Sequence, residues 1–282
     1  MNNALIDLIE LEKLDENLFR GQNFPAVWGT VFGGQVLAQS LNAARRTVDE
    51  DRVLHSMHCY FILPGKLDSS IFFHVDRIRD GKSFTTRRVV AVQNGRPIFN
   101  MSCSFQIAEE GFEHNSTMPN VPHHSQLKTD IELYGKQLDM VPPSIKNYLS
   151  NRYFHFKPIK AFNPFVRAKS EPIQQIWVKS DQELPDNQAF HREALAFVSD
   201  FNLMLTGLMP HRDQFDFGQV QTASLDHAMW FHHDFRVDEW LLFTTESPNA
   251  SNGRGLNFGH FYNEKGDLVA STAQEGLMRM RK

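Results

Sequence analysis

The sequence predicts an α+β protein in which one fold occurs twice. Three observations lead to this prediction. An apolar helical segment near the N-terminus is followed by several segments with the alternation of strands, the same order of elements returns in the second half, and turn signals fall at matching places. With 282 residues, 41% of them hydrophobic, the chain is long enough for two hydrophobic cores. We therefore expect two similar halves, each with a central helix wrapped by an antiparallel sheet.

The first half contains two predicted helices and four predicted strands. Residues 4–14 are amphipathic at helical spacing, and residues 32–46 (FGGQVLAQSLNAARR) open with two glycines before an apolar run that predicts a buried helix. The period then changes to that of strands, which we expect at residues 53–63, 70–80, 83–95 and 96–108. The turn signals between them are Pro64-Gly65, Asp80-Gly81 and Asn94-Gly95.

The middle of the chain has a different composition. Residues 109–165 contain Met118-Pro119, Pro142-Pro143 and many polar residues, with one short predicted helix over residues 130–138. We interpret this segment as a long connection between a first domain at 1–108 and a second at 166–282.

The second half repeats the order of the first. A strand (QQIWVK) leads to an apolar helix over Phe190–Leu208, and the pair Lys265-Gly266 takes the place of Asn94-Gly95. The strands predicted after this helix are residues 222–231, 240–247, 255–262 and 268–275.

Composition excludes several classes of function. The net charge of -4 gives no overall attraction to nucleic acid or to an anionic membrane. The two cysteines, Cys59 and Cys103, lie in apolar segments, which argues against a disulfide framework and for a reducing compartment. Without an apolar run of about 18 residues or a basic signal peptide, we expect no membrane insertion and a cytoplasmic location.

The stretch VQTASLDHAMWFHH brings Ser224, Asp226 and His227 close together in the sequence. On one strand, side chains alternate between faces, so His227 would point away from Ser224 and a compressed Ser/His/Asp triad is excluded. The chain also lacks the GxSxG turn of serine hydrolases. His227, His232 and His233 lack a completing cysteine or carboxylate cluster, so we interpret them as structural histidines and expect no metal.

Asp200 is an acid among apolar residues in FVSDFNLML. Such a residue is rarely buried without a partner or a task, although a capping role in the first turn of a helix is an alternative. Ser224 and Gln274 lie on predicted strands. Taken alone, each is interpreted as a polar residue whose hydrogen bonds are made within the fold. Together with Asp200 they would form a carboxylate, a hydroxyl and an amide that can act on one water molecule.

Several motifs in order resemble those of the type II acyl-CoA thioesterases. These are FGGQVLAQSL, HSMHCYFILPGK, RDGKSFTTRRVVAVQNGRPIF, FVSDFNLM, LDHAMWFH, WLLFTTESPNASNGRG and LVASTAQEGLMR. The resemblance covers most of the chain, thins near residues 110–165, and implies a double hot-dog fold. It also implies hydrolysis of acyl-CoA to a free acid and coenzyme A, and the catalytic set Asp200, Ser224 and Gln274. Bacterial members commonly have Thr in place of Ser224, which keeps the hydroxyl.

The implied chemistry needs no cofactor, because a thioester carbonyl is electrophilic enough for attack by an oriented water. Backbone N–H groups at Gly33-Gly34 are candidate oxyanion donors, with helix packing as the alternative. Basic side chains between Arg77 and Arg96 either meet the coenzyme phosphates or cover a solvated strand face. The resemblance further implies a homodimer or homotetramer. A hot-dog enoyl-CoA hydratase and a non-catalytic acyl-CoA or lipid-binding protein are the alternative functions.

Overall fold

The computed structural model describes residues 4–24, 26, 29–135, 152–161 and 166–281. They form two compact units, each built from more than one segment of the chain. The first comprises Met1–Asn115, Leu184–Phe201 and Asp226–Arg236; the second comprises Ser116–Glu183, Asn202–Leu225 and Val237–Lys282. Both contain helices and antiparallel strands, so the predicted α+β class is confirmed. The tandem boundaries 1–108, 109–165 and 166–282 stay a prediction.

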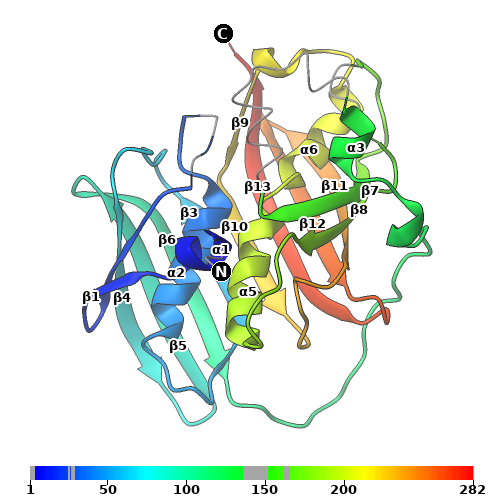
Figure 1. Cartoon of the computed structure of the whole chain (residues 1–282). Helices are drawn as coiled ribbons and strands as arrows, with labels where there is room; N and C mark the ends of the chain where they lie inside the picture. The colour runs from blue at the N-terminus through cyan, green and yellow to red at the C-terminus, as the bar shows by residue number, and fades with distance from the viewer. Residues whose placement is uncertain (1–3, 25, 27–28, 136–151, 162–165, 282) are drawn as a thin grey trace. The chain divides into compact units, whose positions relative to one another are not determined.

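The sheet of the first unit is wholly antiparallel, in the order β1-β2-β4-β5-β6-β3-β10 (Figure 1). The four strands predicted between residues 53 and 108 are present. Asn94 and Gly95, with φ of 51° and 74°, form the turn between β5 and β6, as the Asn-Gly signal predicts. The strands are β1 Glu12–Asp15, β2 Leu18–Gly21, β3 Val53–Phe61, β4 Ile71–Asp80, β5 Phe84–Gln93, β6 Arg96–Gln106 and β10 Asp226–Phe231.

Two helices pack together in the first unit. Helix α2 (Gly33–Arg45) lies against β4, β5 and β6, and also packs on α5 (Gln188–Ser199). Figure 1 shows α2 along the inner face of this sheet. The short α1 spans Ala4–Ile9, so the predicted helix over residues 4–14 is wrong beyond Ile9, where the chain becomes extended as β1.

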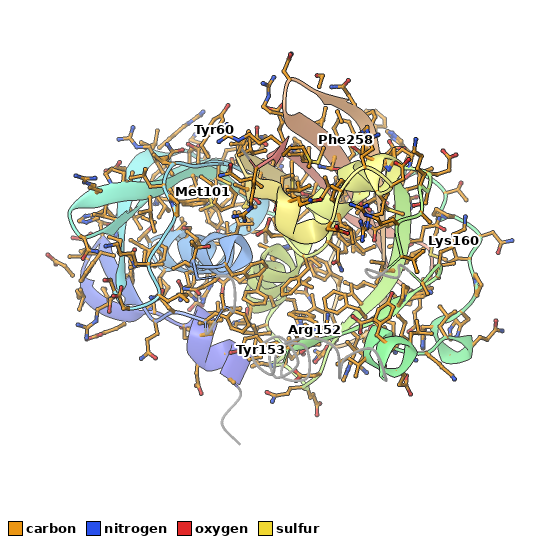
Figure 2. All side chains as sticks on the ribbon, turned by 90° about the horizontal axis from the view of Figure 1, so that it is seen from above. Tyr60, Met101, Arg152, Tyr153, Lys160 and Phe258 are labelled. Atoms are coloured by element: carbon orange, nitrogen blue, oxygen red, sulfur yellow. The ribbon has the colours of Figure 1, made fainter. Side chains whose placement is uncertain are left out.

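Side chains alternate across this sheet as the sequence pattern predicts. Cys59 of β3 pairs with Met101 of β6, and both are buried on the inner face. The next residue along β3, Tyr60, which is labelled in Figure 2, is 62% exposed on the outer face of this sheet. The core includes the fully buried rings of Phe19, Phe73, Phe99 and Phe105.

The sheet of the second unit has the order β13-β12-β11-β8-β7, and β9 also pairs with β13. Helix α6 (Leu203–Leu208) lies on β11, β12 and β13. The turn between β11 and β12 is Asn252-Gly253, with φ of 49° and 71°. The strands are β7 Phe154–Pro158, β8 Ile173–Ser180, β9 Val220–Ser224, β11 Leu241–Ser251, β12 Arg254–Tyr262 and β13 Leu268–Met280.

The segment interpreted as a connection contains regular structure of its own. It holds the 3-10 helix η1 (His124–Gln126), helix α3 (Asp130–Tyr134) and the edge strand β7. Thr129 and Glu132 form a capping box at the start of α3. Arg152, labelled in Figure 2, donates to both oxygens of Asp130 at 2.8 Å. Residues 136–138 of the predicted helix lie outside the described residues.

Two elements predicted as continuous are divided. The predicted helix over 190–208 is two helices, because α5 ends at Ser199 and Asn202 adopts the left-handed φ of 63° before α6. The predicted strand over 222–231 is also two strands, β9 and β10, with Leu225 between them. Two further 3-10 turns, η3 (Met209–His211) and η4 (Phe217–Gln219), lie between α6 and β9. Among the described residues, no helix is long and apolar enough to cross a membrane.

Candidate active site

Asp200 lies at the C-terminal end of α5, with φ of -81° and ψ of -6°. The alternative that it caps the first turn of a helix is therefore wrong. A carboxylate at this end meets the negative pole of its own helix, which is unfavourable. The compensation comes from α2, because the backbone N–H of Gly34 in its first turn donates to Asp200 Oδ2 at 3.0 Å. Asp200 thus binds the positive end of a neighbouring helix.

The two glycines at the start of α2 allow this contact. A Cβ atom on Gly33 would lie 2.5 Å from Asp200 Oδ2, and one on Gly34 would overlap the backbone carbonyl of Phe197 in α5. Both glycines therefore serve the close approach of α2 to α5, which is the packing alternative for this pair. The N–H of Gly34, a candidate oxyanion donor in the sequence, is bonded to Asp200 in this structure.

Cys59 and His227 tie β3 to β10 beside this carboxylate. The thiol of Cys59 donates to the carbonyl of His227 at 3.2 Å. Burial, and secondly the negative charge of Asp200, raises the pKa of Cys59 well above its usual value, so the group stays a neutral thiol. Its role is structural, and it is not a nucleophile.

His227 is buried with a partner of its own. Its Nε2 atom lies 3.0 Å from Ser199 Oγ, whose own hydrogen goes to the carbonyl of Ala196 at 2.9 Å. Nε2 of His227 is therefore engaged with Ser199 and not with Ser224. The exclusion of a compressed triad now rests on this contact, because β9 ends at Ser224 and β10 begins at Asp226, so the argument from one continuous strand does not apply. His232 and His233 are exposed beyond the end of β10.

Ser224 and Gln274 are brought together in the second unit by the pairing of β9 with β13. Ser224 lies opposite Gly276, which places Gln274 on the diagonal of the same face. Gln274 is fully buried, and its Nε2 donates to Ser224 Oγ at 2.5 Å. Because the hydroxyl accepts this bond, its own O–H is directed to another acceptor. A Cβ atom on Gly276 would overlap the end of the Met204 side chain, which would have to move to another rotamer.

Asn257 is a polar residue that sequence reasoning missed. It lies opposite Gln274 on β12 and is fully buried. Its Nδ2 donates weakly to the carbonyls of Gly255 and Gln274 at 3.4 and 3.5 Å, whereas Oδ1 has no hydrogen-bond partner among the described residues. A buried acceptor without a partner is costly and calls for an explanation. The pattern LNFGHF marks Asn257 as a polar residue in an apolar strand, which is the signal that could have identified it.

Three arginines of the basic stretch between Arg77 and Arg96 pair with acidic side chains of the protein. Arg87 is buried, donates to Thr47 Oγ1 at 2.9 Å and pairs with Asp80 at 2.6 Å. The exposed Arg88 pairs with Asp76 at 2.7 Å. Arg77 likewise pairs with Glu16. These three arginines therefore favour the structural interpretation over a site for the coenzyme phosphates.

A pocket opens in the second unit at the start of β9, four residues before Ser224. Apolar side chains from α6, β9 and β13 form part of its wall, and two arginines from β12 and β13 form another part. These residues are Leu208, Val220, Met278, Arg254 and Arg279. Its mixed lining suits an amphipathic ligand.

Two family models match the chain. Residues 24–106 match the family described as acyl-CoA thioesterase N-terminal domain, and residues 148–277 match acyl-CoA thioesterase. The chain is 38% identical to acyl-CoA thioesterase 2 of Haemophilus influenzae, an alignment that covers 98% of this chain and 97% of that protein.

Solved structures agree with these matches. The crystal structure of the acyl-CoA thioesterase II TesB2 from Mycobacterium marinum is 37% identical, covers 99% of this chain and 98% of its own, and superposes with a TM-score of 0.80. A hot-dog protein of unknown function from Alicyclobacillus acidocaldarius covers 100% of both chains with a TM-score of 0.81 at 20% identity, which bears on the fold alone. The hot-dog fold expected from the resemblance is confirmed.

Proposed function

Because the chain belongs to the acyl-CoA thioesterase family, we propose that its Asp200, Ser224 and Gln274 activate the water molecule that hydrolyses acyl-CoA. The reaction of the family converts acyl-CoA and water into a carboxylic acid and coenzyme A, so the protein is a hydrolase. The observation that carries the assignment is the 2.5 Å hydrogen bond from the buried amide of Gln274 to the hydroxyl of Ser224.

Each group has a distinct task in this mechanism. The ionised carboxylate of Asp200 accepts a proton as the water oxygen attacks the thioester carbonyl carbon. Ser224 and Gln274 hold the water through their hydroxyl and amide, which fixes its lone pair toward that carbon. The tetrahedral intermediate then collapses, the carbon–sulfur bond breaks, and the departing thiolate takes the proton back from Asp200. The reaction passes through no acyl-enzyme.

The anchoring of Asp200 supports its role. Its Oδ2 accepts the N–H of Gly34, a donor that stabilises the ionised carboxylate. With one oxygen fixed by the backbone, rotation of the carboxylate is restricted. A fixed base accelerates the reaction more than a mobile one, because folding has already fixed its orientation.

The test is thiol release from acyl-CoA substrates of several chain lengths, followed with a chromogenic thiol reagent. Asp200→Asn should lower kcat about a hundredfold to ten-thousandfold, and Gln274→Ala about tenfold to a thousandfold. Ser224→Thr keeps the hydroxyl and should retain most activity, whereas Ser224→Ala should not. Thr222→Ala, an exposed position on the same strand, is the matched control and should leave kcat unchanged.

The protein's own thiols should not disturb this measurement. Cys59 and Cys103 are both buried, and burial raises the pKa of Cys103 to about 12. Full activity in Asp200→Asn or Gln274→Ala would refute the site assignment while leaving the family function intact. Loss of enoyl-CoA absorbance without thiol release would instead favour the hydratase alternative, and binding without turnover would favour the lipid-binding one. A cytoplasmic location and a homodimer or homotetramer stay predictions.

A further inference from the structure

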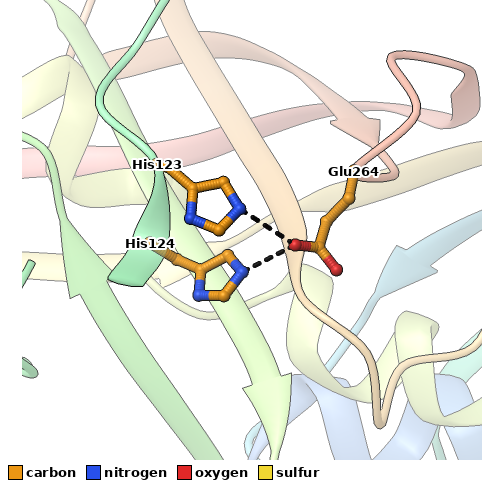
Figure 3. A group of neighbouring side chains, drawn as sticks. All are labelled: His123, His124 and Glu264. Carbon is orange, nitrogen blue, oxygen red and sulfur yellow. Dashed lines mark hydrogen bonds and ion pairs between the residues drawn. The ribbon is translucent and has the colours of Figure 1, made fainter. Parts of the chain in front are cut away.

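Two imidazoles and a carboxylate converge in the second unit, and none of the three belongs to the residues proposed for hydrolysis. His123 and His124 stand at the start of η1, and Glu264 lies in the turn between β12 and β13 (Figure 3). The Nε2 atoms of the two histidines lie 3.2 and 2.6 Å from the same carboxylate oxygen, Glu264 Oε1. All three potential ligand atoms lie within 4.8 Å of one another.

We propose that His123, His124 and Glu264 bind a divalent transition-metal ion of the class of Zn²⁺ and Cu²⁺. Imidazole nitrogen suits both ions. Two histidines and one glutamate also form one of the ligand sets that proteins use for zinc, with the fourth position left to water or another ligand. The proposal concerns a site other than the three residues assigned to hydrolysis, and it does not depend on them.

The spacing of the ligand atoms fits such an ion. Bonds of about 2.0–2.1 Å in tetrahedral geometry place neighbouring ligand atoms about 3.3 Å apart. His123 Nε2 and Glu264 Oε1 already have this spacing at 3.2 Å. His124 Nε2, at 2.6 Å from the same oxygen, needs to move away by about 0.7 Å, which a small rotation of an exposed glutamate side chain supplies.

Neighbouring groups hold the two rings in place. Ser125 holds the ring of His123 at Nδ1, because its backbone N–H donates to this nitrogen at 3.3 Å and its Oγ lies 2.8 Å from the same atom. The ring of His124 stacks on Trp240, with centroids 5.0 Å apart and planes inclined by 21°, and meets the edge of Trp177 at 5.5 Å. The two histidine rings are therefore held in place by packing and hydrogen bonds.

Solvent access and nearby charges also affect the binding of an ion at this site. The side chain of His123 is 53% exposed, so an ion can reach the site from solvent. Glu264 supplies a negative charge, while Lys157, which donates to the backbone carbonyl of His124 at 3.0 Å, brings a positive charge that opposes a cation. A bound ion would link the segment that carries η1 to the turn between β12 and β13 within this unit.

The two tryptophans beside His124 give a direct readout. Metal-free full-length protein is titrated with Cu²⁺, followed by quenching of tryptophan fluorescence, and with Zn²⁺, followed by calorimetry. We expect one equivalent to bind, and Zn²⁺ to raise the midpoint of thermal unfolding because it binds only the folded state. His124→Ala and Glu264→Gln should each weaken binding at least about tenfold.

His114→Ala removes an exposed histidine outside the group and is the matched control, which should bind as the wild type does. Unfolding midpoints of the variants measured without metal separate loss of ligand from loss of fold. Glu264→Gln also serves to separate these effects, because it keeps the shape of the side chain and removes only its charge. The proposal is overturned if the wild type binds neither ion up to about 1 mM, or if both ligand variants bind as tightly as the wild type.

Discussion

Replacing Gly33 by alanine places a methyl group against the carboxylate of Asp200. The new Cβ atom would lie 2.5 Å from Asp200 Oδ2 and 3.0 Å from the ring of Phe61, whereas ordinary van der Waals contact begins at 3.4 Å. The carboxylate therefore has to move by about 0.9 Å, or α2 has to shift by a similar distance. The end of an aspartate side chain moves more easily than a helix, so we expect the carboxylate to give way.

The magnitude follows from how steeply catalysis depends on position. A misplacement of about 1 Å can cost about a hundredfold in rate, which corresponds to about 2.7 kcal/mol of transition-state stabilisation. We therefore expect Gly33→Ala to lower kcat by tenfold to about a hundredfold. Stability should change little, because Gly33 is the first residue of α2 and the end of the Asp200 side chain can move to relieve the crowding.

Two matched glycines make the result interpretable. Gly34→Ala meets the backbone carbonyl of Phe197, which cannot move alone, so it should destabilise the fold by about 1–3 kcal/mol. A Cβ atom on Gly111 has no neighbour within 4 Å, so Gly111→Ala should leave kcat and the unfolding midpoint unchanged. The assay is kcat from thiol release, with thermal unfolding in parallel. If Gly33→Ala kept the wild-type kcat while Asp200→Asn abolished activity, the position of the carboxylate inferred from α2 would be refuted.

The remaining predictions concern two buried polar groups. Glu193 of α5 is 1% exposed and pairs with Arg45 of α2 at 2.5 Å. Burial raises the pKa of Glu193 in the folded state. The contribution of this group to stability is therefore present below about pH 4.5 and is lost as the pH rises through the raised folded-state pKa. Arg45→Met removes the ion pair of this carboxylate and should lower the free energy of unfolding by about 3–5 kcal/mol at pH 8 and by less at pH 4. Glu193→Gln should become more stable relative to the wild type as the pH rises. Equal shifts of the urea midpoint at both pH values would contradict this. Asn257→Leu removes the unpartnered Oδ1 opposite Gln274, and we expect about a tenfold loss of kcat with an unchanged or higher unfolding midpoint. Unchanged kcat in that variant would make Asn257 a structural residue only.

The strands and turns were predictable because their signals are local. Alternation along β3 to β6 and the Asn94-Gly95 pair determine both the strands and the turn between β5 and β6, and the structure has them at the predicted places. The break between α5 and α6 was not predicted, because FVSDFNLML stays apolar across it. Asn202, a residue type that tolerates the left-handed conformation, is the local signal that was available.

The surroundings of the site residues are non-local and could not be read from the sequence. The N–H of Gly34 and the carboxylate of Asp200 are 166 positions apart, and their bond exists because α2 packs on α5. The strand break at Leu225 is similar, since it follows from pairing of β9 with β13 and of β10 with β3. Ser224 and Gln274 were selected as polar residues on predicted strands and then through the family motifs. Their hydrogen bond depends on a strand register that no local pattern fixes.

The location of Asp200 links the fold to its proposed role. At the C-terminus of α5 a carboxylate is disfavoured by its own helix, so the position contributes nothing to the stability of α5. The N-terminus of α2 restores a favourable environment through one backbone N–H, and the glycines of α2 permit the approach. A residue that is poorly placed for its own helix and yet held by another is better explained by a task than by folding. For the same reason Asp200→Asn, which keeps an acceptor for Gly34 and removes a charge from the C-terminus of α5, should lose activity without losing stability.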